Sequence, residues 1–129
     1  MAIRMVQFNT GVAVGSSGSA TSTGYSTAIA GEVLKVYVDF QDSPPAGTCD
    51  FTLSDESDPG SESIVAITNS STDAAFCPRR VTELNEGTDI TYDGTNEVYA
   101  PYIVHGRLEA VIAQVNAADY ANVTVWYRN

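Results

Sequence analysis

The clearest pattern along the chain is an alternation of apolar and polar residues with a period of two. Over residues 33–40, one face carries Lys35 and Asp39 and the other face is apolar. The apolar members are Leu34, Val36, Val38 and Phe40. A period of two is typical of a β-strand that packs one face on the core, so the pattern predicts a half-buried strand here.

Two more strands are expected at the C-terminus, over residues 107–115 and 122–128. Residues 116–119, Asn-Ala-Ala-Asp, separate them, and Asn and Asp suit turn positions. The two strands therefore predict a β-hairpin. In the second one Trp126 falls on the polar face, which indicates a covered surface over its ring.

Shorter apolar runs fill the rest of the chain and are separated by residues that favour turns. No window carries the period of an amphipathic helix. Strands at spacings of about ten residues predict an all-β fold, an antiparallel sandwich or jelly roll of about seven to nine strands. The additional strands are expected over residues 3–8, 25–30, 49–54, 63–68, 80–84 and 98–104. The expected core consists of Leu34, Val36, Val38, Leu108, Ile112, Val123 and Val125.

The length of the chain indicates how many domains it forms, and its net charge indicates which partners it does not bind. A chain of 129 residues is the size of one domain, so residues 1–129 are expected to fold as a single unit. The net charge of −10 and the pI of about 4.1 oppose binding to nucleic acid or to an anionic membrane. No stretch reaches the roughly 20 apolar residues that cross a bilayer. Neither nucleic acid nor a membrane is expected as a partner.

The first 31 residues differ from the rest, because Arg4 is their only charged residue and they hold five of the ten glycines. Residues 15–24 are rich in Gly, Ser and Thr, which favours flexibility. Two interpretations stay open for residues 1–31: a first hairpin with a mobile loop, or an arm that becomes ordered against a neighbouring subunit. The second makes Arg4, Gly15, Gly18 and Tyr25 candidate subunit contacts.

No catalytic, cofactor or metal site is expected. His105 is the only histidine, and no nucleophile motif accompanies it. The Gly-Ser-Ser-Gly segment at 15–18 lacks the lysine of a phosphate-binding loop. Eleven of the sixteen acidic residues lie between positions 50 and 97, but without the spacing of a calcium loop, so they indicate a solvated acidic face. The chain is therefore not expected to be an enzyme.

The two cysteines and a pair of adjacent arginines each allow two interpretations. Cys49 and Cys77 are either two free thiols or one disulfide, and they are too few for a disulfide scaffold. Arg79 and Arg80 form the one concentrated positive element. They are expected either to pair with carboxylates such as Glu83 or to contact a partner protein.

Four segments in a fixed order carry a resemblance to small structural proteins of tailed bacteriophages. They are FCPRR at 76–80, DITYDG at 89–94, YIVHGRLEAVIAQ at 102–114 and VTVWY at 123–127. In that family an aromatic-x-Pro-Arg segment precedes a Val-x-Gly-x-Leu strand and a closing Val-Thr-Val-x-Tyr strand. The likeness covers about residues 33–128.

The resemblance implies a β-sandwich virion protein, most similar to a capsid decoration (cement) protein. It implies synthesis in the host cytoplasm, a place on the capsid surface, and the major capsid protein as partner. It also implies a homo-oligomer, with a trimer favoured. The residues expected to contact the capsid or another subunit are Arg4, Gly15, Gly18, Tyr25, Arg79, Arg80 and Trp126.

Two alternatives to the decoration protein remain. A phage neck, tail or head-fibre protein would have the same fold. A carbohydrate-binding β-sandwich would expose a line of aromatic side chains, and the candidates are Tyr25, Tyr92, Tyr99 and Trp126.

Overall fold

A computed structural model describes residues 2–41 and 43–129. Within that part of the chain there are nine strands and no helix, so no membrane-spanning helix is found there either. All strand pairs are antiparallel, which confirms the predicted all-β sandwich class. The strands are β1 (Ile3–Asn9), β2 (Ala20–Phe40), β3 (Asp50–Asp55), β4 (Ser63–Ile67), β5 (Ala74–Phe76), β6 (Arg79–Val81), β7 (Tyr99–Pro101), β8 (Ile103–Val115) and β9 (Ala121–Arg128).

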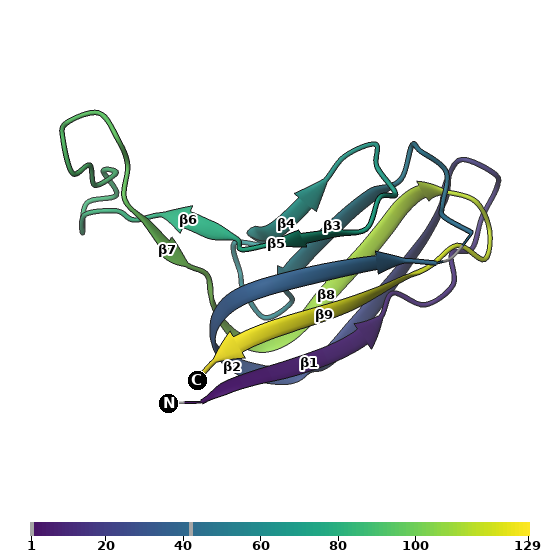
Figure 1. Cartoon of the computed structure of the whole chain (residues 1–129), viewed down its shortest axis with the longest axis horizontal. Helices are drawn as coiled ribbons and strands as arrows, with labels where there is room; N and C mark the ends of the chain where they lie inside the picture. Colours follow the sequence, from purple (N-terminus) through teal and green to yellow (C-terminus); the bar gives the residue numbers. More distant parts are fainter. Residues whose placement is uncertain (1, 42) are drawn as a thin grey trace.

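One long strand, β2, belongs to both layers of the sandwich (Figure 1). Its N-terminal part pairs with β8, from Ala20 opposite Val115 to Glu32 opposite Ile103. Its C-terminal part pairs with β9, from Glu32 to Phe40 opposite Ala121. The first layer therefore runs β2-β8-β3-β4, and the second runs β1-β9-β2-β5. The sequence predicts two separate strands in this region, and the structure joins them into one.

The change of layer occurs around Gly31, where β2 bends. Gly31 has a φ of +143°, a conformation that residues with a side chain rarely adopt. A Cβ atom at this position would overlap the backbone carbonyl group of Arg128 on β9. Glycine therefore allows both the bend and the close approach of the C-terminal strand.

The core lies between the two layers and consists of aliphatic and aromatic side chains that point inward from both. Six of the seven predicted core residues are fully buried: Val36, Val38, Leu108, Ile112, Val123 and Val125. Phe51 and Leu53 on β3 are also fully buried, and the Phe51 ring packs edge-on against Phe40 at 6.5 Å between centroids. Each such buried side chain contributes about 1.5–3 kcal/mol of hydrophobic stabilisation.

The prediction that Leu34 belongs to the core is wrong. Leu34 is only half-buried, whereas its neighbour Val33 is fully buried. The register of β2 against β9 shifts between Val33 and Lys35, as at a β-bulge. An extra residue in one strand reverses the alternation of faces, which a strict period of two cannot anticipate.

The prediction of a C-terminal hairpin is also wrong. In the described residues β8 and β9 are not paired with each other; each pairs with a different part of β2. Residues 116–120 do form a turn, in which Asp119 accepts a hydrogen bond from the Asn116 N–H at 2.9 Å. This turn carries the chain from one layer to the other. β8 and β9 can then each bury an apolar face in the core from opposite sides.

Residues 2–31 are built into the sandwich. β1 pairs along the whole of β9, and β2 starts at Ala20. β1 and β2 are therefore neighbours of β9 and do not form a paired hairpin. The loop between them is held by backbone hydrogen bonds from Thr10 to Ala121 at 3.0 Å and from Ala13 to Asp119 at 2.8 Å.

Replacing Gly31 with Ala should destabilise the fold by about 2 kcal/mol or more, because it adds backbone strain and a steric overlap at the bend. Chemical denaturation followed by circular dichroism measures the change. Gly47→Ala is the matched control, since no atom lies within 4 Å of a Cβ atom placed there. Equal stability of the two variants would contradict the role of Gly31.

Candidate binding surfaces

A two-stranded β-ribbon projects from the sandwich near the bend of β2 (Figure 1). Residues 78–102 make up this projecting ribbon, in which β6 pairs with β7. Two hydrogen bonds attach its base to β2: the Val33 N–H donates to the Tyr102 carbonyl at 2.9 Å, and the Arg79 guanidinium donates to the Leu34 carbonyl at 3.3 Å.

The distal part of the projecting ribbon is folded by its own backbone hydrogen bonds. The Thr82 N–H donates to the Val98 carbonyl at 2.8 Å, and the Ile90 N–H donates to the Thr82 carbonyl at 2.9 Å. The Val98 N–H donates to the Ile90 carbonyl at 3.0 Å. At the tip, Asp93 accepts hydrogen bonds from the N–H groups of Thr95 and Asn96, which holds its pKa below the ordinary value. The ribbon is therefore preformed.

The surface of the projecting ribbon combines apolar side chains with negative charge. Leu84, Tyr92 and Tyr99 are exposed, and the Tyr92 side chain is 73 % exposed. Residues 82–98 contain no basic residue and five carboxylates: Glu83, Glu86, Asp89, Asp93 and Glu97. These exposed apolar side chains, set among carboxylates on one preformed element, make the ribbon a candidate interaction site. Sequence reasoning interpreted the acidic residues as a solvated face and named Tyr92 and Tyr99 only for the carbohydrate-binding alternative. It missed that they share one projecting element, although the acidic run without a base was a signal for it.

The two arginines at the base of the ribbon have partners within the chain. Arg80 forms ion pairs with Glu62 at 3.3 Å and Glu83 at 3.4 Å, the second of which the sequence suggests. Arg79 donates to the carbonyl groups of Leu34 and Pro78. Exposed ion pairs contribute about 1 kcal/mol or less, so these contacts mainly orient the ribbon.

The outward face of β1, β9 and the C-terminal part of β2 forms a second surface, which we call the amide face. Strand register places its side chains in rows across the three strands, Gln7 beside Thr124 and Thr124 beside Tyr37. Its members are Gln7, Asn9, Tyr37, Asp39, Asn122 and Thr124. Trp126 lies in the next row, half-buried, with the Lys35 ammonium 5.2 Å from its ring centroid. The expectation that Trp126 is covered therefore holds for part of its ring.

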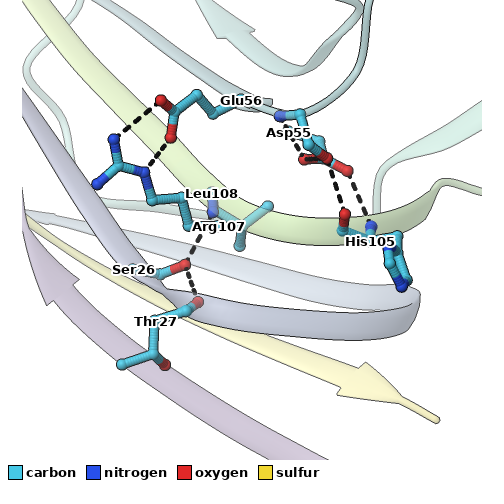
Figure 2. Close-up of polar contacts among 8 residues, drawn as sticks. Ser26, Thr27, Asp55, Glu56, His105, Arg107 and Leu108 are labelled. Carbon is cyan, nitrogen blue, oxygen red and sulfur yellow. Dashed lines mark hydrogen bonds and ion pairs between the residues drawn. The ribbon is translucent and has the colours of Figure 1, made fainter.

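Tyr25 lies on the other layer. It is 42 % exposed, and the Arg107 guanidinium stacks on its ring at 3.9 Å from the centroid. Arg107 also forms a two-pronged ion pair with Glu56, which Figure 2 shows. Tyr25 is thus engaged within the chain.

Asp55, Ser57 and His105 come together, but without the geometry of a catalytic triad. The Ser57 hydroxyl donates to Asp55 Oδ1 at 2.7 Å, and the second carboxylate oxygen accepts from the backbone N–H of His105 at 2.9 Å. The His105 ring lies away from the carboxylate (Figure 2). A triad requires the imidazole between acid and nucleophile, so this cluster is a structural cap on the β3–β4 turn.

The residues expected to contact a capsid or another subunit are not brought together. Gly15 and Gly18 lie in the loop that follows β1, where the Gly18 N–H donates to Asn116 Oδ1 at 3.0 Å. Arg4 is exposed on β1, at the outer edge of its layer. Tyr92 and Tyr99 are on the projecting ribbon. The proposed line of aromatic residues is therefore divided among three surfaces.

Both cysteines are free thiols in the structure. Cys49 is fully buried beside β3, and Cys77 is exposed just before the ribbon. Burial, reinforced by the nearby charges of Asp50 and Asp119, raises the pKa of Cys49 to about 11. The thiol of Cys49 is therefore inert at neutral pH.

Comparisons with known proteins found no matching family model, no matching curated protein and no matching solved structure. Within the described residues, no group of three or more His, Cys, Asp or Glu side chains is arranged to hold a metal ion. The two surfaces are therefore interpreted from their own chemistry.

Asp55 predicts a pH dependence of stability. Burial alone would raise its pKa, but hydrogen bonds from His105 and Ser57 hold it below the ordinary value. The carboxylate therefore stabilises the fold above about pH 4, and this contribution is lost as pH falls through the lowered pKa. Asp55→Asn should cost about 1–3 kcal/mol at pH 7, with the deficit shrinking toward pH 2.

Urea denaturation between pH 2 and pH 7 checks this expectation. Glu86→Gln, which removes a carboxylate from an exposed position of the ribbon, is the control and should follow the unmodified protein. A deficit in Asp55→Asn that stays constant over the whole range would show that the charge of Asp55 is not what stabilises the turn.

Proposed function

We propose that the chain is a non-enzymatic structural subunit of a tailed-phage particle, a decoration protein that binds the outside of the capsid shell. The order of four segments that resembles small phage structural proteins supports this proposal. The structural observation that carries it is the projecting ribbon. The partner would be the major capsid protein, and the chain would be made in the host cytoplasm before it joins the virion.

The ribbon suits binding to another protein because it is preformed and combines two kinds of contact. Its backbone hydrogen bonds are satisfied before binding, so little conformational entropy is lost when a partner docks. Leu84, Tyr92 and Tyr99 can enter apolar pockets, and tyrosine is enriched among residues that dominate binding energy. The five carboxylates select a partner surface that carries basic groups.

A decoration protein stabilises a shell without catalysing a reaction. It binds the assembled lattice in preference to free subunits, so binding shifts the equilibrium toward the assembled form by mass action. Many copies would be needed on each particle. The compact acidic sandwich would stay outside, and the ribbon would reach across the boundaries between capsomers.

Self-association is part of the proposal. β1 is the outer strand of its layer, and Ile3 and Met5 on it are exposed. An edge strand with unpaired backbone groups can add a strand from a second copy. A homo-oligomer is consistent with this edge, and the preference for a trimer comes from the resemblance alone.

Replacing Leu84 and Tyr92 together with Ser should weaken binding to capsids that lack the protein by about tenfold or more, because the apolar anchors are removed. Binding is measured by co-sedimentation with purified capsids, at two salt concentrations. The affinity of the unmodified protein should fall as salt rises, since the carboxylates contribute. Val12→Ser, at an exposed apolar residue in the loop between β1 and β2, is the control and should bind normally.

Unchanged binding by the Leu84 and Tyr92 double variant would contradict the role of the ribbon. Counting copies in purified particles by quantitative mass spectrometry distinguishes the locations. Hundreds of copies support a decoration protein, whereas about a dozen or fewer would assign the chain to the neck, tail or head fibre.

A further inference from the structure

The amide face contains a groove that the proposed capsid contact does not use. The groove has a volume of about 560 Å³, within the range of small-ligand sites. Residues from all three strands line it, and the side chains of Phe8 and Val123 at its base turn away to pack in the core. The outward polar side chains that line it are Gln7, Asn9, Tyr37, Asp39, Asn122 and Thr124.

Hydrogen bonds across the strands hold these side chains in place. The Asn9 amide donates to Asn122 Oδ1 at 2.8 Å, and the Gln7 amide donates to the Thr124 hydroxyl at 3.2 Å. Asn9 Oδ1 accepts from the Gly11 N–H at 2.6 Å, which fixes its amide further. The Asn122 Nδ2 group and Gln7 Oε1 have no partner within the described part of the chain. Asn122 Nδ2 is therefore a hydrogen-bond donor, and Gln7 Oε1 an acceptor, that a ligand in the groove can reach.

The chemistry of the groove matches an uncharged sugar. Adjacent hydroxyl groups of a saccharide both donate and accept, so one can accept from Asn122 Nδ2 while a neighbour donates to Gln7 Oε1. Tyr37, which is half-buried, lines the same groove, and an aromatic side chain supplies an apolar contact for a sugar ring. Among the described residues that line it, Asp39 is the only charged one, and its negative charge disfavours a polyanion.

We propose that the amide face is a binding site for a neutral oligosaccharide, made of hexose or N-acetylhexosamine units. The site lies on the sandwich and the proposed capsid contact lies on the projecting ribbon, so the two are separate. A subunit held by its ribbon keeps the amide face free for a glycan on a surface near the particle. The inference does not depend on the proposed function.

The test uses the full chain on an array of neutral hexose and N-acetylhexosamine oligosaccharides, followed by titration of the strongest hit. Thr124→Val keeps the shape of the side chain and removes its hydroxyl, and Asn122→Ala removes the presented donor. Each should weaken binding about tenfold. Thr52→Val is the matched control, because Thr52 is a half-buried outward residue on β3 of the other layer and should leave affinity unchanged.

Thermal unfolding of each variant checks that the fold is kept. The Leu84 and Tyr92 double variant should bind glycan normally, so failure of the capsid contact and failure of the glycan site are distinguishable. Absence of any hit on the array would overturn the proposal. A hit whose affinity is the same in Thr124→Val, Asn122→Ala and Thr52→Val would overturn it as well.

Discussion

The whole architecture depends on one strand that serves two layers. β2 exchanges β8 for β9 as its hydrogen-bonded neighbour near Glu32, so the layers cannot form independently of each other. Gly31 makes this possible, because a side chain there would collide with the Arg128 carbonyl. Once β2 bends, β8 and β9 lie across the core from each other, and their inward valines, leucines and isoleucines exclude water between them.

The bend also determines where the two candidate surfaces lie. Val33 and Leu34, directly after it, supply the backbone groups that attach the projecting ribbon. The part of β2 that follows contributes Tyr37 and Asp39 to the amide face. The projecting ribbon is apolar and acidic and extends away from the sandwich, whereas the amide face is a mostly uncharged polar groove on the sandwich itself. In our proposals, the first surface attaches the chain to a protein partner and the second binds a small ligand.

Much of the fold could be predicted from local sequence patterns, and the errors share a cause. The alternation in residues 33–40 correctly identified Val36 and Val38 as buried, since a strand face is a local property. Leu34 was misplaced because a bulge depends on the partner strand. The turn at 116–119 was correctly located, but which strands it joins in space depends on long-range pairing. For the same reason Gln7 and Thr124, far apart in sequence, could not be recognised as neighbours.

Hydrogen exchange of backbone amides, measured by NMR, tests most directly whether β2 unites the two layers. If it does, amides in the part of β2 paired with β8 and in the part paired with β9 exchange only through global unfolding, with the same free energy. The same value should be found in the centres of β8 and β9. A clearly lower free energy of exchange for one layer than for the other would contradict this, because it would mean that the layers open separately.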